Sequence, residues 1–390
     1  VNETLQPIMK AQDTYFKDSF TLKEVLDTLL LPPNSSLFTY DAISMYTRID
    51  TKDCIERLSN LLRSPDTQGK FPHYSPEALI SAIKIVMNNN RMRFGDIVVR
   101  QITGIAMGMS PAPTIANLYI AAYEQSHLPP YFPKPLLFLK RFIDDGFGIW
   151  LHDSDPVTDE KNWLNFKKMI NQSGLTWTFS IRSPQATFLD MIISIKNGRL
   201  ITQLFKKPGA LQLFIPPQSC HPPGVITGLI MGNVLRIFRL CSLAQDIKKE
   251  LNAFYEAILA RGYQLSTIKP IFEKAINNAK NYIKYPMKYR ERKKLRQNEL
   301  STRERLFFHV PFHPNNPPSR ILQHLWHTKV YHPPGKLPLN KLTNREGETI
   351  FTNQLVIAYS RASNLGNLLS YRRIDRRSGP KVSSYMIRHE

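Results

Sequence analysis

The spacing of apolar residues along the first two hundred positions changes between one typical of strands and one typical of helices. Alternating or short apolar runs predict strands at 37–43, 175–181, 187–195 and 199–205, with a hairpin at 138–151. Apolar residues three and four apart predict helices at about 21–31, 51–62, 76–87, 113–124 and 156–170. This order predicts an α+β fold in which helices cover one face of a mainly antiparallel sheet.

Local signals predict where several of these elements begin and turn. Thr21 with Glu24 reads as a capping box, and Ser75 before Pro76 reads as a helix N-cap. Asn197-Gly198 predicts a hairpin turn, and Asp145-Gly146 reads as the turn of the hairpin at 138–151.

The apolar pattern after Pro208 becomes helical and then ends. Helices are predicted at 225–241, 244–261 and about 266–285, the second with Gly262 past its end. The run 284–296 holds seven basic residues and one acidic one, and a solvated face and a phosphate contact explain it equally well. The tail from Ser301, rich in Pro and His, is predicted to be irregular.

Charge narrows the class of partner. Lys and Arg number 52 against 31 Asp and Glu, which gives a net charge of +21. On a folded chain with many aromatic residues, such an excess indicates a polyanion, with nucleic acid ahead of an anionic membrane surface.

Other compositional features exclude several classes. Cys54, Cys220 and Cys241 are too few and too far apart for a disulfide framework or a cysteine zinc site. No apolar run is long enough to span a bilayer and no signal peptide opens the chain, so the expectation is a soluble intracellular protein. No period of 20 to 50 residues repeats, which excludes a solenoid.

Histidines in the tail could bind a metal or could be surface residues. His309 and His313 are four residues apart, and His324 and His327 are three apart, with His332 beyond. Prolines between 311 and 318 oppose a helix there and no Cys or acidic ligand lies near, which favours surface or packing roles.

Three carboxylates carry the strongest chemical signal. Asp41 lies near the end of an apolar strand, where a buried unpaired charge would cost several kcal/mol, so a cleft, a cation or a paired partner is expected. Asp144 and Asp145 lie at the hairpin tip. Turn chemistry alone explains the tip, but with Asp41 the set suits two divalent cations that transfer a phosphoryl group to a polynucleotide.

Three segments resemble the A, B and C motifs of a reverse transcriptase palm, in that order: LFTYDAISMYTRI, QITGIAMGMSPAPTIANLY and FLKRFIDDGFGIW. Among reverse transcriptases they are most similar to those of Penelope-like retroelements, relatives of telomerase. FLDMIIS, LFKKPGALQLFIPPQSCHPPG and LVIAYSRASNLGNLL resemble later blocks of the same family. The similarity therefore spans nearly the whole chain.

The resemblance implies RNA-directed DNA polymerase activity with an RNA template, a DNA primer, deoxynucleoside triphosphates and two Mg²⁺ ions, Mn²⁺ being possible. Asp41, Asp144 and Asp145 would be catalytic and hold the metals, and Tyr46 would exclude a ribose 2′-OH. Residues that would line the substrates are Gln101, Gly104 and Lys207.

The resemblance also implies a domain order. A connector at 1–36 would precede a palm at 37–208, a helical thumb at 209–300 and an irregular basic C-terminal extension at 301–390. Only 40 residues precede Asp41, whereas the family places its fingers there, so the expectation is that either the chain is N-terminally truncated or the copy has decayed. An inactive nucleic-acid-binding remnant is the alternative function. Nuclear or cytoplasmic localisation without membrane contact is expected, and the oligomeric state stays open.

Overall fold

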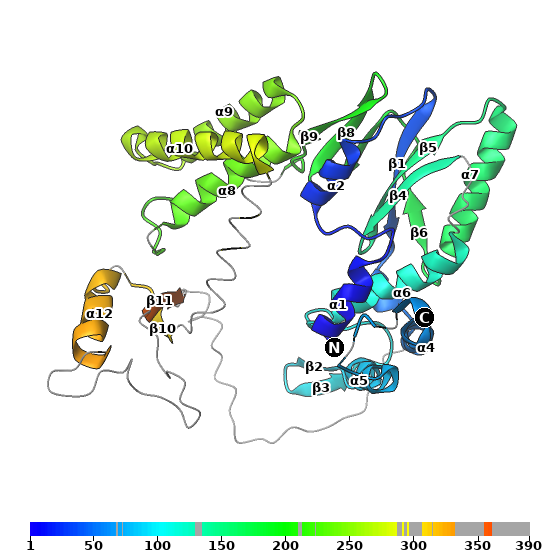
Figure 1. Ribbon diagram of the computed structural model, residues 1–390, viewed down its shortest axis with the longest axis horizontal. Coiled ribbons are helices and arrows are strands. Elements are labelled where there is room, and N and C mark those ends of the chain that lie inside the picture. Colours follow the sequence, from blue (N-terminus) through cyan, green and yellow to red (C-terminus); the bar gives the residue numbers. More distant parts are fainter. Residues whose placement is uncertain are drawn as a thin grey trace. The chain divides into compact units, whose positions relative to one another are not determined.

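The computed structural model describes residues 1–67, 69–71, 73–128, 135–209, 213–222, 224–286, 291, 295, 306–313, 315–331 and 355–360. The described residues fall into two units (Figure 1). The first comprises Val1–Pro208 and Leu240–Leu243, and the second comprises Gly209–Arg239 and the described residues from Ala244 onward.

Four antiparallel strands form the central sheet of the first unit. They lie in the order β4-β5-β1-β6, with bounds Leu136–Phe142, Asp145–Leu151, Ser35–Ala42 and Trp177–Phe179. Side chains of β1 alternate as predicted: Leu37 packs on one face of the sheet, and Phe38 and Tyr40 pack on the other.

Helices bury the face that carries Phe38. The helices of this layer are α1 (Asn2–Lys10), α4 (Thr51–Arg63), α5 (Pro76–Asn88), α6 (Ala112–His127) and α7 (Pro156–Asn171). The Phe38 ring meets Trp163 and Phe166 of α7 edge-on, with centroids 4.9 and 5.5 Å apart. Burial of one such side chain contributes roughly 1.5–3 kcal/mol, so this aromatic cluster anchors β1.

A smaller layer covers the opposite face, where Leu37 lies. It consists of α2 (Ser19–Leu26) and the antiparallel sheet β7 (Gln185–Phe188), β8 (Met191–Lys196) and β9 (Arg199–Leu204). Phe147 and Ile149 of β5 pack in this second core. The predicted α+β arrangement with antiparallel sheets and helices is therefore confirmed.

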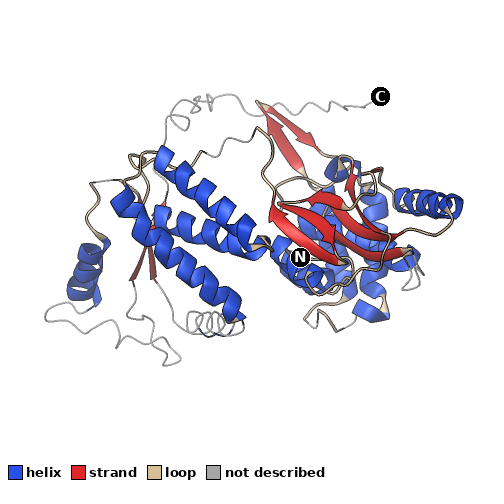
Figure 2. Ribbon diagram, turned by 90° about the horizontal axis from the view of Figure 1, so that it is seen from above, coloured by secondary structure: helices blue, strands red, loops and turns tan. Residues whose placement is uncertain are grey.

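The second unit is mainly helical in its first half (Figure 2). It contains α8 (Val225–Leu240, the last residue lying in the first unit), α9 (Ala244–Ala260) and α10 (Leu265–Lys284). Gly262, in the link between α9 and α10, has φ +94°, which favours glycine. No helix in the described part of the chain is both long enough and apolar enough to cross a membrane.

Four sequence predictions about these elements were wrong. Asp18, not Thr21, caps α2, and its side chain accepts a hydrogen bond from the Thr21 N–H. The strand expected at 187–195 is two strands, because Leu189 turns the chain with φ +50°. Gly146 lies in β5 rather than in a turn.

The fourth wrong prediction is the irregular tail. The tail contains two parallel strands, β10 (Leu306–Pro311) and β11 (Leu355–Ser360). Between them in the sequence lie α12 (Ser319–Leu325) and a π-helix (Trp326–Tyr331). Most of the basic run at 284–296 lies outside the described residues, as does His332.

Sequence reasoning also missed a hairpin before the glycine loop. Strands β2 (Arg91–Phe94) and β3 (Ile97–Arg100) pair antiparallel around Gly95-Asp96. Gly followed by Asp between short strands is a hairpin signal, so the pattern was available in the sequence.

Candidate active site

Asp41 and Asp145 lie directly opposite each other on neighbouring strands. Asp41 is the penultimate residue of β1 and Asp145 is the first residue of β5, and their Cα atoms are partners in the antiparallel register. Like charges in this position destabilise a sheet. The pair therefore marks a site where charge repulsion is tolerated.

Two glycines set the register that brings these aspartates together. Gly146 and Gly148 of β5 lie opposite Tyr40 and Phe38 of β1. A Cβ atom on Gly146 would lie 2.0 Å from the Tyr40 ring, and one on Gly148 would lie 2.1 Å from the Phe38 ring. Because only glycine leaves room for these rings, a slip of one residue is excluded and Asp41 is held opposite Asp145.

The hairpin tip consists of Ile143 and Asp144. Phe142 pairs with Asp145, so only these two residues turn, and Ile143 has φ +57°. A β-branched residue is an outlier at positive φ. The Asp144 carbonyl accepts a hydrogen bond from the Ala42 N–H at 3.1 Å, which attaches the tip to the end of β1.

A buried ion pair between Arg141 and Glu124 stabilises the tip through a hydrogen bond to the Ile143 carbonyl. Arg141, 1% exposed, donates from Nε and Nη2 to the two carboxylate oxygens of Glu124 in α6 at 2.8 and 3.0 Å. Its Nη1 donates to the Ile143 carbonyl at 2.8 Å and to Asn117 Oδ1 at 3.1 Å. The Thr14 hydroxyl donates to Glu124 at 2.6 Å. Sequence analysis did not single out Arg141 or Glu124.

The three carboxyl groups influence one another's ionisation. Burial, then Asp144 and Asp41, raise the pKa of Asp145 to about 6, and Lys207 opposes the shift. Burial and Asp144 also raise the pKa of Asp41. Asp41 and Asp145 are partners in the register, so a proton on one of the two carboxyl groups lowers their mutual repulsion. A cation at this position would replace that proton.

Tyr46 lies close enough to Asp144 for the charge of that carboxyl group to affect its hydroxyl. It belongs to the short helix α3 (Met45–Arg48) that follows β1, and it is half-buried. Burial and the nearby Asp144 raise the pKa of its hydroxyl, which therefore stays protonated. The ring is placed where it can meet whatever approaches Asp144.

The glycine loop is attached to the backbone of Tyr46. The Ile105 N–H donates to the Tyr46 carbonyl at 2.6 Å, and the Gly104 N–H donates to the Ile49 carbonyl at 3.0 Å. Gly104 has φ +85°, and a Cβ atom there would lie 2.6 Å from the Tyr46 carbonyl and 2.9 Å from Gln101 Nε2. Gln101 and Gly104 are thereby held beside Tyr46.

Lys207 is the last predicted site residue, and it follows β9. It is exposed, and its charge lowers the pKa of Asp145. The structure therefore brings the seven predicted residues into one region. They are contributed by β1, α3, the glycine loop, the β4–β5 tip and the segment after β9.

The carboxylates suit a Mg²⁺ ion whose remaining ligands come from substrate phosphates and water. No group of three or more His, Cys, Asp or Glu side chains among the described residues is arranged to hold a metal unaided. Mg²⁺ usually takes one or two carboxylates and keeps waters or phosphates as its other ligands. The opposed carboxyl groups of Asp41 and Asp145, with Asp144 adjacent, supply such oxygens.

We expect the metal-free chain to lose stability as the pH rises through 6. A raised carboxyl pKa means that the folded state favours the protonated form of Asp145. Its contribution to the free energy of unfolding is therefore full below the ordinary pKa of 3.8 and is lost as the pH rises through the folded-state pKa of about 6. Thermal unfolding at pH 5 and pH 7.5 measures the loss. Mg²⁺ should reverse it at pH 7.5, and Asp145→Asn should remove this component. An identical pH profile in that variant would contradict the assignment.

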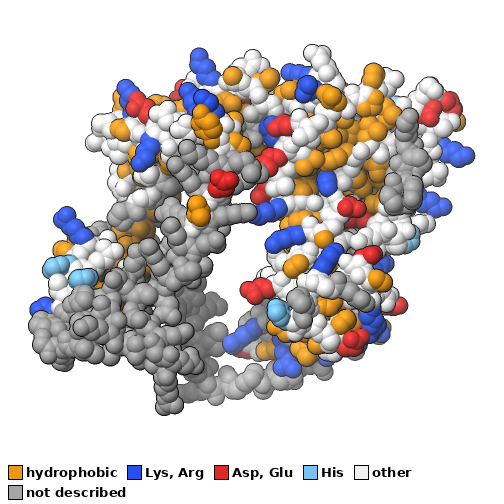
Figure 3. Space-filling view, viewed as in Figure 1, with side chains coloured by type: hydrophobic (Ala, Val, Ile, Leu, Met, Phe, Trp, Pro, Cys, Tyr) orange, Lys and Arg blue, Asp and Glu red, His pale blue; other side chains and the backbone are white. Residues whose placement is uncertain are grey.

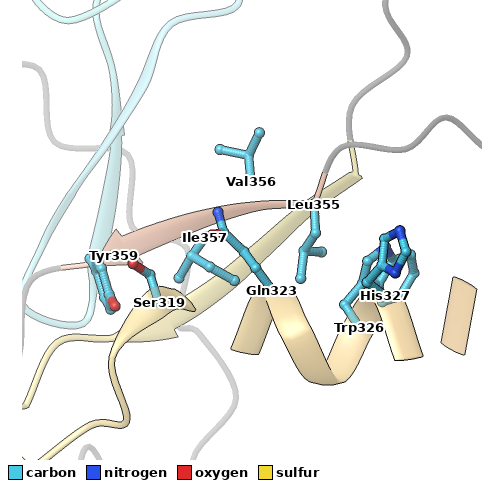
Figure 4. A pocket seen from close by; sticks show the side chains of 8 residues that line it. All are labelled: Ser319, Gln323, Trp326, His327, Leu355, Val356, Ile357 and Tyr359. Carbon is cyan, nitrogen blue, oxygen red and sulfur yellow. The ribbon is translucent and has the colours of Figure 1, made fainter. Parts of the chain in front are cut away.

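The second unit contains a separate cavity of about 520 Å³ between α12, the π-helix and β11 (Figure 4). Trp326, His327 and Tyr359 are among its lining residues, and the buried Trp326 Nε1 has no hydrogen-bond partner among the described residues. His327 is accompanied by no cluster of metal ligands in this described region. The metal alternative for the tail histidines thus gains no support from the described residues.

The fold of the chain is similar to those of solved telomerase and viral RNA polymerase structures. Telomerase from Candida albicans, solved with a fragment of telomeric RNA, matches with TM-score 0.50 and 11% identity over 71% of this chain and 46% of that one. Apo telomerase from Candida tropicalis matches with TM-score 0.41 and 12% identity over 70% and 49%. The RNA-dependent RNA polymerase of BmCPV matches with TM-score 0.44 and 16% identity over 65% and 23%.

Sequence comparisons are more limited. A family model described as the animal helix-turn-helix domain matches residues 213–273, which include α8, α9 and the start of α10. No curated protein matches the sequence. The chain spans less than half the length of the telomerase chains that it matches. At this identity the comparisons show the fold alone, and that fold is similar to the polymerase domains of telomerase.

Proposed function

We propose that this chain is the palm and thumb portion of an RNA-directed DNA polymerase of a Penelope-like retroelement. Residues 37–208 form the palm, 209–300 the thumb and 301–390 a C-terminal extension. The reaction joins a deoxynucleotide to the 3′ end of a DNA primer on an RNA template. The observation that carries the proposal is the pair of opposed carboxyl groups of Asp41 and Asp145 at the ends of neighbouring strands, with Asp144 next in the chain and raising the pKa of both.

Asp41, Asp144 and Asp145 would hold the Mg²⁺ ions. When bound, such ions activate the primer 3′ oxygen and stabilise the leaving pyrophosphate. The protein's own contribution is positional. The Phe38–Gly148 and Tyr40–Gly146 contacts fix the two strands, so the carboxylates need little reorganisation when substrate arrives.

Side chains around the carboxylates would select and orient the nucleotide. Gln101 and Gly104 line the incoming nucleotide and the template base, and the absence of a side chain at Gly104 lets the loop pack against the Tyr46 carbonyl and Gln101 Nε2. Lys207 contributes positive charge on the side of Asp145.

We expect Tyr46→Ala to weaken discrimination against ribonucleotides on the order of tenfold, about 1.4 kcal/mol. The half-buried Tyr46 ring would block a 2′-OH, and the backbone carbonyl of Tyr46 is hydrogen-bonded to the glycine loop. Single-nucleotide incorporation with matched ribo- and deoxynucleotides measures the ratio. Tyr46→Phe should behave like the wild type, and so should Tyr74→Ala, which removes an exposed ring. Unchanged selectivity in Tyr46→Ala would remove the gate role.

Primer extension tests the proposal as a whole. The protein is given an RNA template with an annealed DNA primer, deoxynucleotides and Mg²⁺, with a DNA template of the same sequence in parallel. Template-length product on RNA supports the polymerase. Tight primer–template binding without product under Mg²⁺ or Mn²⁺ would instead favour the inactive nucleic-acid-binding remnant.

A further inference from the structure

The β2–β3 hairpin presents a basic face beside the glycine loop. Arg91 lies directly opposite Arg100 in the register, and Arg93, two residues along β2, lies on the same face. The fourth residue of this face is Val98. All three arginines are exposed.

Nothing in the described part of the chain neutralises this face fully. Arg93 lies 3.5 Å from Asp96, and both side chains are more than half exposed. Arg91 and Arg100 form no ion pair with a described residue. Like charges directly opposite in a sheet are destabilising. The free hairpin therefore retains a repulsion that a bound polyanion would relieve.

A short, hydrogen-bonded segment joins the hairpin to the proposed active site. Strand β3 ends at Arg100, and the next residue is Gln101, whose N–H donates to the Asn90 carbonyl at 2.9 Å and closes the base of the hairpin. The loop then continues to Gly104, which is hydrogen-bonded beside Tyr46. A strand held on the basic face would therefore lead towards the nucleotide site.

The opposite face of the hairpin differs in character. Met92, Ile97 and Val99 lie on it, so the ribbon has one apolar and one basic side. The basic side carries no aromatic residue, which favours contact with phosphates over stacking on bases. Lys and Arg elsewhere are spread over the visible surface of the described residues (Figure 3), so charge alone would not single out this hairpin.

We propose that Arg91, Arg93 and Arg100 bind the phosphate backbone of the unpaired template strand. This inference rests on the proposed polymerase function and adds a template-docking surface to it. Arg91 and Arg93 are about 6.8 Å apart along the strand, a spacing suited to successive phosphates of one extended strand. The contact is independent of base sequence and sensitive to salt.

The test uses Arg100→Glu, which exchanges the repulsive pair for an attractive one. We expect the melting temperature without nucleic acid to rise, because Arg91 then faces a carboxylate. We expect affinity for an RNA–DNA primer–template with a 5′ RNA overhang to fall. A solvated face without a ligand would give the rise in stability alone, so the two readouts separate the explanations.

Salt titrations and a matched control sharpen the result. Arg91→Ala with Arg100→Ala should reduce the slope of log K against log salt by roughly 0.7 per arginine. Lys168→Glu makes the same charge change as Arg100→Glu at an exposed site on α7 and should weaken overhang binding less.

Three results would contradict different parts of the proposal. If Arg100→Glu binds the overhang substrate as Lys168→Glu does, the docking surface is wrong while the polymerase proposal stands. If it weakens a blunt duplex equally, the template-strand assignment is wrong. If the wild type binds no primer–template, the proposed function itself fails.

Discussion

Replacing Asp144 with asparagine is expected to reduce primer extension by about 10³-fold or more. The substitution keeps the shape of the side chain but removes one of three carboxylates that would hold Mg²⁺. Metal stabilisation of a phosphoryl-transfer transition state is worth several kcal/mol, and each 1.36 kcal/mol is tenfold in rate. Single-turnover extension of a labelled primer on an RNA template measures the loss.

Binding and folding should be unaffected by Asp144→Asn. The tip is held through the backbone of Asp144 and Ile143, which the change leaves in place. Asp66→Asn, at an exposed carboxylate, is the control for a lost surface charge and should extend normally. Extension at the wild-type rate by Asp144→Asn would refute the metal assignment.

Replacing Arg141 with methionine is expected to destabilise the fold by about 3–5 kcal/mol, since it leaves the buried Glu124 carboxylate without its cation. Both side chains are at most 5% exposed and are joined by two hydrogen bonds. Denaturant unfolding measures the change. The Ile143 carbonyl also loses its donor, so extension by the folded fraction should fall as the tip moves.

A surface ion pair in the same unit supplies the matched control. Arg63 and Glu77 lie 3.3 Å apart with both side chains more than half exposed, and Arg63→Met should cost no more than about 1 kcal/mol. Combining Arg141→Met with Glu124→Leu should cost less than the sum of the single changes. A loss below about 1 kcal/mol in Arg141→Met alone would show that the pair does not support the tip.

Much of the sheet could be predicted because its signals are local. The alternation of Leu37, Phe38 and Tyr40 predicted β1 and its two faces, and the Asn197-Gly198 turn fixed the pairing of β8 with β9. The three aspartates were found because charged residues at the ends of apolar strands are unusual and need a partner.

The features that hold the aspartates in place were missed because they depend on contacts between distant segments. Gly146 looked like a turn residue, and only the Tyr40 ring, brought opposite by pairing of β1 with β5, gives its strand role. The turn falls instead on Ile143, a residue that no local rule places at positive φ. Arg141 and Glu124 meet only after α6 packs behind β4.

Iron-mediated cleavage can locate the proposed divalent-cation site on this chain directly. Fe²⁺ replaces Mg²⁺ at oxygen sites and, with peroxide and ascorbate, cleaves nearby backbone. We expect cuts near residue 41 and near 144–145, suppressed by excess Mg²⁺ and lost in Asp144→Asn. Cuts confined to other segments, or cuts at these positions that persist in Asp144→Asn, would contradict it.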